Sequence, residues 1–268
     1  MKLELFPEDL QDFLIPSAAG GLGYNCLSCG RVHPPKELHY TCPDCGGLLL
    51  LEDARQDRLT ERPGSFWRRL FDYRRMLNIP ALSGIFTYHE FLAPLSPVED
   101  IVYLGEGHTP VVPAPAHLAD RVGLEFFVKH DGQNPSASFK DRGMAAALSY
   151  LNYLIRSQDL KEVLAVCAST GDTSAAAALY SAALAPGLVK SAVLLPKGKV
   201  TLPQLSQPLG AGAQDFELPG VFDDCMKVVE YPSDNYQVAL LNSKNPWRVL
   251  GQESYAYEVA QQFDYEVG

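Results

Sequence analysis

The sequence predicts an α/β protein in which a parallel sheet carries helices on both faces. From Leu124 onward, short apolar runs alternate with segments of helical periodicity, which is the pattern of parallel strands connected by helices. Polar, glycine-containing loops follow several of these runs, where ligands of such sheets bind. Two C-x-x-C pairs precede this region and predict a small zinc-ribbon-like segment. We therefore expect two units, residues 1–55 and residues 56–268.

Composition and charge limit the partners of the chain. Its 268 residues are 47% hydrophobic, enough to bury a substantial core, and the net charge is −10. This charge argues against nucleic acid and anionic membranes as main partners. The sequence contains no apolar run of about 18 residues, the length needed to span a membrane. The first residues also lack the apolar region of a signal peptide, so we expect a cytoplasmic protein.

Four of the six cysteines have the spacing of metal ligands, and a glycine follows each pair. They are Cys26, Cys29, Cys42 and Cys45. Two such turns complete a tetrahedral site of four thiolates, which predicts a structural Zn²⁺ that leaves no position open for catalysis. Redox chemistry and a metal-free ribbon are the alternatives. His33 and His39 lie between the pairs and could replace a ligand, although we favour surface positions for both.

The region between the cysteines and the predicted sheet reads as one helix and several loops. Residues 52–75 are charged and carry aromatic side chains in helical register, which predicts a connecting helix. Prolines between residues 80 and 97 predict loops with short helical pieces. Residues 104–110, L-G-E-G-H-T-P, predict a fixed loop. Its His108 is more typical of a structural histidine than of a base or a metal ligand.

The predicted sheet region contains four strands and five helices. The strands cover residues 125–129, 163–167, 191–195 and 236–241, and Phe216 begins a short strand or loop. The helices cover residues 140–157, 175–184, 202–209, 221–231 and 246–263. The second of these helices is rich in alanine and follows the turn at residues 168–174.

Residues 134–143, N-P-S-A-S-F-K-D-R-G, hold the candidate reactive residue. We expect Lys140 in the first turn of a helix, just after Ser138 as a candidate N-cap. The partial positive charge of a helix N-terminus favours a neutral amine, and burial favours it further. A neutral amine can form a Schiff base with a carbonyl cofactor. An exposed lysine in a polar first turn is the alternative, and it is the more common case for a lysine considered alone.

Two further loops are expected at the same edge of the sheet. Residues 169–173, S-T-G-D-T, begin a helix with free N–H groups and suit an anion such as a substrate carboxylate. Considered alone, this loop is better explained as an ordinary capped turn. Residues 242–248, N-S-K-N-P-W-R, offer amides, a hydroxyl and a guanidinium, which suit phosphate. A solvated polar loop explains this second segment equally well.

Taken together, these segments resemble the threonine synthase family, pyridoxal-phosphate enzymes with the tryptophan-synthase-β fold (fold type II). The matching segments lie at residues 105–110, 134–143, 168–178, 195–200 and 242–254, in the order of the family. Bacterial and archaeal members of the family also commonly carry the paired C-x-x-C ribbon. The resemblance spans about residues 22–268. Five ordered motifs are far more specific than any single glycine-rich loop.

The resemblance implies a role for each loop. Lys140 matches the lysine that binds pyridoxal 5'-phosphate covalently and then moves protons. Asp172 matches a position beside the 3′-oxygen of the cofactor, where many relatives have asparagine. The residues that match the grip on the substrate's α-carboxylate are Ser169, Thr170 and Thr173. Those that match the grip on the substrate phosphate are Asn242, Ser243 and Arg248.

The reaction that the resemblance implies converts O-phospho-L-homoserine and water to L-threonine and phosphate, with the cofactor as electron sink. The expected partner is this small molecule, and a homodimer is the candidate assembly. Cysteate synthase or another fold type II lyase is the alternative enzyme. A non-catalytic zinc-ribbon binding module on a degenerate enzyme scaffold is the alternative of another class.

One departure from the family concerns the end of the sequence. In the family, a strand after the 246–263 helix leads into a glycine- and asparagine-rich loop that binds the phosphate of the cofactor. The sequence stops before that strand. We therefore expect an incomplete fragment of a longer enzyme, which binds the cofactor weakly and has little activity alone.

Overall fold

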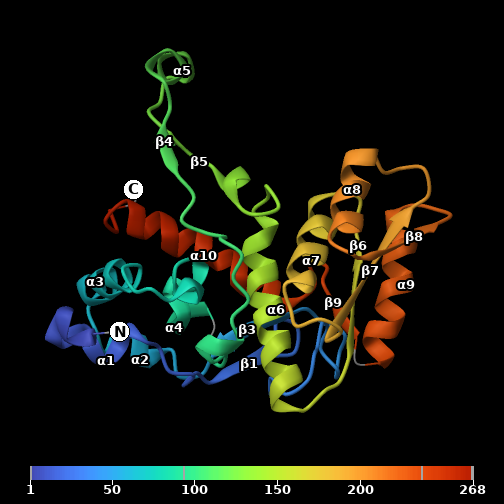
Figure 1. Ribbon diagram of the computed structural model, residues 1–268, viewed down its shortest axis with the longest axis horizontal. Helices are drawn as coiled ribbons and strands as arrows, with labels where there is room; N and C mark the ends of the chain where they lie inside the picture. Colours follow the sequence, from blue (N-terminus) through green and yellow to red (C-terminus); the bar gives the residue numbers. More distant parts are fainter. Residues whose placement is uncertain (1, 93, 237, 267–268) are drawn as a thin grey trace.

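The computed structural model of the chain describes residues 2–92, 94–236 and 238–266, and its centre is a four-stranded parallel sheet (Figure 1). The strand order is β8-β7-β6-β9, and all three neighbouring pairs are parallel. The strands are β6 (Val163–Ala168), β7 (Val189–Pro196), β8 (Gln214–Leu218) and β9 (Val238–Leu240). The predicted parallel sheet is confirmed, and the segment around Phe216 is a strand. Gln237, within the last predicted strand, lies outside the described residues.

Helices cover both faces of this sheet, as predicted. They are α7 (Asp172–Ala182) and α8 (Leu202–Gly210) on one face and α9 (Phe222–Asn235) on the other. Successive side chains of β7 point to opposite faces. Val193 and Leu195 pack with Ala178 of α7, whereas Ala192 and Leu194 pack in the cluster beneath α9.

The two long helices α6 (Lys140–Ser157) and α10 (Pro246–Gln262) cross at a pair of glycines. A Cβ atom on Gly251 would lie 2.5 Å from the backbone oxygen of Arg142 and 2.9 Å from the Cα of Gly143. No side chain fits in that space, so only glycine lets the two backbones approach so closely. The crossing holds the first turn of α6 against the first turns of α10.

The predicted strand at residues 125–129 is not part of the parallel sheet. Within this segment, β5 (Phe127–Lys129) pairs antiparallel with β4 (Val111–Pro113). With α5 (Ala116–Val122) at its tip, this two-stranded ribbon projects from the molecule (Figure 1). Phe127 is 54% exposed, so an apolar run predicted a strand here but not the partner with which it pairs.

The N-terminal region forms a second, antiparallel sheet of order β2-β1-β3. Its strands are β1 (Leu22–Cys26), β2 (Val32–His33) and β3 (Leu49–Asp53), and we call residues 22–53 the cysteine ribbon. Short helices precede it, namely η1 (Leu3–Leu5), η2 (Glu8–Leu10) and α1 (Gln11–Leu14). Tyr24 of β1 shares one core cluster with Tyr150 and Trp247. The ribbon therefore packs directly on α6 and α10.

The connecting region contains more short elements than the sequence predicts. Residues 52–75 form the end of β3 and two helices, because Pro63 directly precedes the second helix and separates it from the first. These helices are α2 (Asp57–Thr60) and α3 (Gly64–Arg74). The expected short pieces follow as η3 (Pro80–Leu82), η4 (Ile85–Tyr88), α4 (His89–Leu92) and η5 (Val98–Asp100), and η6 (Asp131–Gln133) precedes the lysine loop. Of the helices that the structure describes, none is long and apolar enough to cross a membrane.

Candidate functional site

Lys140 is the first residue of α6, as the sequence predicts. Ser138 is buried and accepts a hydrogen bond from the Lys140 N–H (3.2 Å), although Phe139 is the residue that directly precedes the helix. Burial lowers the pKa of the Lys140 amine, and the positive charge of Arg248 lowers it further, while Asp172 acts in the opposite direction. These effects favour the neutral amine, and they place Arg248 and Asp172 within electrostatic reach of Lys140.

The loop that follows β6 meets the lysine loop. Asp172 begins α7, and one of its carboxylate oxygens accepts a hydrogen bond from the Ser138 hydroxyl (3.2 Å). Ser169 is buried, and its hydroxyl accepts a hydrogen bond from the Gly171 N–H (3.1 Å). Thr170 in this loop and Thr173 in the first turn of α7 are half-buried. The structure thus brings Asp172 to the lysine loop at the start of a helix.

The segment after β9 lies beside these two loops. Asn242 is buried, and its side chain accepts from the N–H of Ala168 (2.9 Å) and donates to its carbonyl oxygen (2.6 Å). This pair of bonds joins the ends of β9 and β6, a structural role that the sequence did not indicate. Ser243 is exposed. Asn245 caps α10 by accepting hydrogen bonds from Trp247 N and Arg248 N.

Arg248 is a buried cation with unused hydrogen-bonding capacity. Arg248 is only 4% exposed, and one of its terminal N–H groups donates a hydrogen bond to the Leu241 carbonyl (2.8 Å). Within residues 2–92, 94–236 and 238–266, its Nε has no hydrogen-bond partner and its guanidinium forms no ion pair. Burial lowers the pKa of the Arg248 guanidinium. An anion at this point would supply the missing partner.

A buried ion network lies behind the lysine loop. Arg142 is fully buried and donates to both carboxylate oxygens of Asp131 (3.0 and 2.9 Å) and to Glu258 of α10 (2.7 Å). Lys129 of β5 donates to the other oxygen of Glu258 (2.6 Å). Although burial raises the pKa of Glu258, its bonds from Arg142 and Lys129 lower it to about 2. This network could not be predicted from the sequence, because its members are far apart in the chain and each resembles an ordinary surface charge.

The loop at residues 104–110 is fixed against the same elements. Thr109 donates its hydroxyl hydrogen to Asp131 (2.6 Å), and Gly107 N–H donates to the Asn134 side chain (3.0 Å). Burial lowers the pKa of His108 to about 4, and its ring lies 3.2 Å from the Thr87 hydroxyl. A neutral, packed histidine agrees with the structural role favoured by the sequence.

Glu106 in this loop is a buried carboxyl group with no cation among the groups that shift its pKa. It is 0% exposed, and one oxygen accepts from Leu104 N–H (3.0 Å) and from the Tyr180 hydroxyl (2.7 Å). The other oxygen has no hydrogen-bond partner among the described residues. Burial raises the pKa of Glu106 to about 7, and the nearby Asp141 acts in the same direction.

The four cysteines of the two C-x-x-C pairs lie together in the cysteine ribbon. Their sulfur atoms all lie within 4.8 Å of one another, with Cys26–Cys45 at 3.5 Å and Cys29–Cys42 at 3.7 Å. A zinc ion about 2.3 Å from each of four sulfurs requires sulfur separations of roughly 3.8 Å, so the thiols fit this ion. His33 lies 3.4 Å from the Cys42 sulfur, and it is also close to Asp44.

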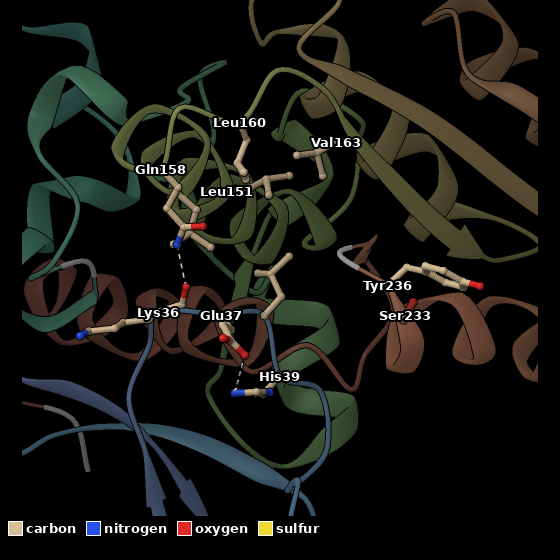
Figure 2. Close-up of a pocket in the computed structure, with 11 residues that line it drawn as sticks. Lys36, Glu37, His39, Leu151, Gln158, Leu160, Val163, Ser233 and Tyr236 are labelled. Carbon is tan, nitrogen blue, oxygen red and sulfur yellow. Dashed lines mark hydrogen bonds and ion pairs between the residues drawn. The ribbon is translucent and has the colours of Figure 1, made fainter.

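A cavity of about 270 Å³ lies at the end of α6 that is far from Lys140 (Figure 2). Leu151 and Leu154 of α6 line it together with Gln158, the residue after α6, and residues 36–39 of the cysteine ribbon line it from the other side. Glu37 and His39 point toward each other at its edge (Figure 2). This cavity is separate from the three loops at the carboxyl ends of the strands.

The family model for pyridoxal-phosphate dependent enzymes matches residues 102–268. A threonine synthase of Methanocaldococcus jannaschii is 35% identical over 251 residues, which are 90% of this chain and 54% of that protein. A threonine synthase of Synechocystis is 44% identical over 175 residues, 65% of this chain and 43% of that protein. The chain thus spans about half the length of the curated relatives it matches.

Solved structures share the fold at lower sequence identity. A diaminopropionate ammonia lyase from Escherichia coli superimposes with a TM-score of 0.53 at 17% identity. The superposition covers 63% of this chain and 49% of that protein. The likeness supports the predicted fold type.

The raised pKa of Glu106 predicts how the free energy of unfolding depends on pH. Because its pKa is about 7 in the folded protein and about 4.3 in an unfolded chain, the stabilising effect of its proton is complete below about pH 4.3 and is lost as the pH rises through 7. Glu106→Gln keeps a side-chain oxygen that can accept these hydrogen bonds, but it removes the ionisable carboxyl group. Between pH 5 and pH 8 the wild type should lose about 1–3 kcal/mol more free energy of unfolding than this variant. Equal losses in urea denaturation would show that Glu106 does not titrate in this range.

Proposed function

Since the chain belongs to the family of pyridoxal-phosphate dependent enzymes, we propose that it acts as a threonine synthase on O-phospho-L-homoserine. The observation that carries the proposal is the position of Lys140, at a helix start within electrostatic reach of Asp172 and of the buried Arg248, whose Nε has no hydrogen-bond partner among the described residues. A phosphate-bearing substrate explains why a buried guanidinium lacks an ion partner in the described protein. The names of the curated relatives support the same activity.

We propose that Lys140 carries the cofactor and moves protons during the reaction. Its lowered pKa favours the neutral amine that an aldehyde requires. When bound, pyridoxal phosphate would supply an electron sink for charge that develops on the substrate. The Lys140 amine would be placed to accept and return protons at the substrate carbon atoms next to the cofactor.

The two neighbouring loops would hold the charged ends of the substrate. We assign the α-carboxylate to the loop at the start of α7, with Ser169, Thr170 and Thr173 as ligands. The substrate phosphate is assigned to Arg248, with Ser243 and Asn242 beside it. Although Ala168 occupies the Asn242 amide, its nitrogen keeps one further N–H to donate. Asp172, which already accepts a bond from Ser138, lies on the cofactor side of Lys140 in this proposal.

The remaining expectations are also proposals. A structural Zn²⁺ in the cysteine ribbon is supported by the sulfur separations. A cytoplasmic location and a homodimer are proposed from the resemblance to the threonine synthase family. The division at residue 55 remains a prediction. Cysteate synthase is the second enzyme considered, because it would use the same phosphate grip.

The substrate is tested by assaying product formation from O-phospho-L-homoserine, O-phospho-L-serine and L-threonine in parallel, with added pyridoxal phosphate. We expect slow release of phosphate together with L-threonine from the first compound only, because the distance between carboxylate and phosphate loops sets the substrate length. Arg248→Met should lower the rate about 100-fold or more, since it removes a charged phosphate ligand. Preference for phosphoserine would instead support the cysteate synthase assignment.

The zinc proposal is tested by metal analysis and chelation. We expect about one Zn²⁺ per chain, and a lower midpoint of thermal unfolding after treatment with a chelator. Cys42→Ser should lose the metal, because a buried thiolate ligand is removed. Cys225→Ser is the matched control, since Cys225 is a buried cysteine of α9 that does not belong to the group of four clustered thiols. Chelation without any effect on metal content or unfolding would contradict a structural zinc site.

A further inference from the structure

Residues 35–40 of the cysteine ribbon, which we call the ribbon loop, are held by several parts of the molecule. Three consecutive backbone carbonyls of this loop each accept a hydrogen bond from a different side chain. The bonds run from Tyr150 to Pro35, from Gln158 to Lys36 (2.7 Å) and from Tyr24 to Glu37 (3.1 Å). The bond to the loop from Gln158, the residue after α6, is visible in Figure 2. The ribbon loop is therefore fixed to α6 and β1 before it reaches β9.

Tyr40, at the end of the ribbon loop, bonds to the open side of β9. The strand lies at the edge of the parallel sheet and pairs with β6 on one side. On its other side, the Tyr40 hydroxyl donates to the Val238 carbonyl (3.1 Å) and accepts from the Leu240 N–H (2.9 Å). An edge strand leaves such alternate groups unpaired. One hydroxyl thus replaces part of a missing neighbouring strand.

Burial makes this bridge hard to replace. Tyr40 is 4% exposed, and its ring packs with Val166, Val229 and Leu240 beneath α9. Loss of the hydroxyl would leave a buried N–H and a buried C=O without partners, which costs more than the bonds themselves contribute. The ring alone would still fill its place in the core.

The end of β9 supports both anion-binding loops. Asn245 donates to the Leu240 carbonyl (2.9 Å) and caps the helix that carries Arg248. Asn242 clamps the backbone of Ala168, the residue before the Ser169 loop. A shift of Leu240 would therefore move the turn at residues 241–245 and disturb both loops.

A second contact joins the ribbon to the residue next to Arg248. The Trp247 ring N–H donates to the Tyr24 hydroxyl (2.9 Å), and its ring stacks on Tyr150 at 3.6 Å between ring centroids. Tyr24 also holds the ribbon loop through Glu37. The ribbon therefore contacts the segment from β9 to Arg248 in two places. Tyr40 bonds to β9 at the start of this segment, and Tyr24 bonds to Trp247 near its end.

We propose that Tyr40 is a positioning residue through which the cysteine ribbon fixes the end of β9 and the turn at residues 241–245, and so sets the anion-binding geometry at Arg248. The role of the anion rests on the proposed function, whereas the link from Tyr40 to the turn does not. If the ribbon loses its proposed Zn²⁺, the position of Tyr40 should change, and with it the turn at residues 241–245. The ribbon thereby acts in ligand binding without touching the ligand.

The test compares Tyr40→Phe with the wild type by amide hydrogen exchange and by titration with inorganic phosphate in a calorimeter. Tyr153→Phe is the matched control, because it makes the same chemical change on α6 outside the ribbon, β9 and the loops. We expect Leu240 and the amides of residues 241–245 to exchange about tenfold faster or more in Tyr40→Phe only. Amides of α3, which makes none of these contacts, should change less than those of residues 240–245. Phosphate affinity should fall about threefold or more.

Unchanged exchange at residues 240–245 in Tyr40→Phe would overturn the proposal, as would faster exchange with unchanged phosphate affinity. If the wild type binds no phosphate, the assignment of Arg248 under the proposed function fails, and the exchange rates alone decide the link from Tyr40. Chelator-treated wild type should show the same faster exchange, and Tyr40→Phe should add no further increase there. Slow exchange after metal removal would contradict a role for the ribbon.

Discussion

The buried ion network around Arg142 is the interaction on which the site depends most. It joins β5, η6, α6 and α10, four elements that nothing in the local sequence brings together. Its two cations and two carboxylates balance in charge, as a buried network requires. Removing one partner would leave a buried charge uncompensated, at a cost of about 3–5 kcal/mol. Because Arg142 is two residues from Lys140, the network fixes where Lys140 lies.

The close crossing of α6 and α10 adds a second constraint at the same point. Gly143 and Gly251 let the backbones approach directly beside Arg142. The first turn of α6, with Lys140, therefore faces the first turn of α10, with Arg248. The lowered pKa of Lys140 is a consequence of this arrangement, since burial and the charge of Arg248 are its main causes.

Much of the fold could be predicted because apolar periodicity is a local signal. The parallel strands, the helices on both faces and the position of Lys140 at a helix start all follow from short stretches of sequence. Partners in space could not be predicted in this way. The run at residues 125–129 shows that a strand forms, but its antiparallel pairing with β4 depends on a segment that gave no strand signal.

The same limit applies to the site. Residues on recognisable loops, such as Asp172 and Arg248, were predicted as candidates, whereas Asp131 and Glu258 were not, because their function depends on contacts with Arg142 across the fold. Asn242 shows an intermediate case. Its loop was recognised, but its bonds to Ala168 are visible only once β6 and β9 lie side by side.

The most direct test of this account is to identify the residue that pyridoxal phosphate modifies. The protein would be mixed with excess cofactor, reduced with borohydride and digested, and the labelled peptide sequenced by mass spectrometry. We predict label on Lys140, because burial and the charge of Arg248 lower the pKa of its amine. Label spread over exposed lysines, or the same labelling in a Lys140→Arg variant, would contradict it.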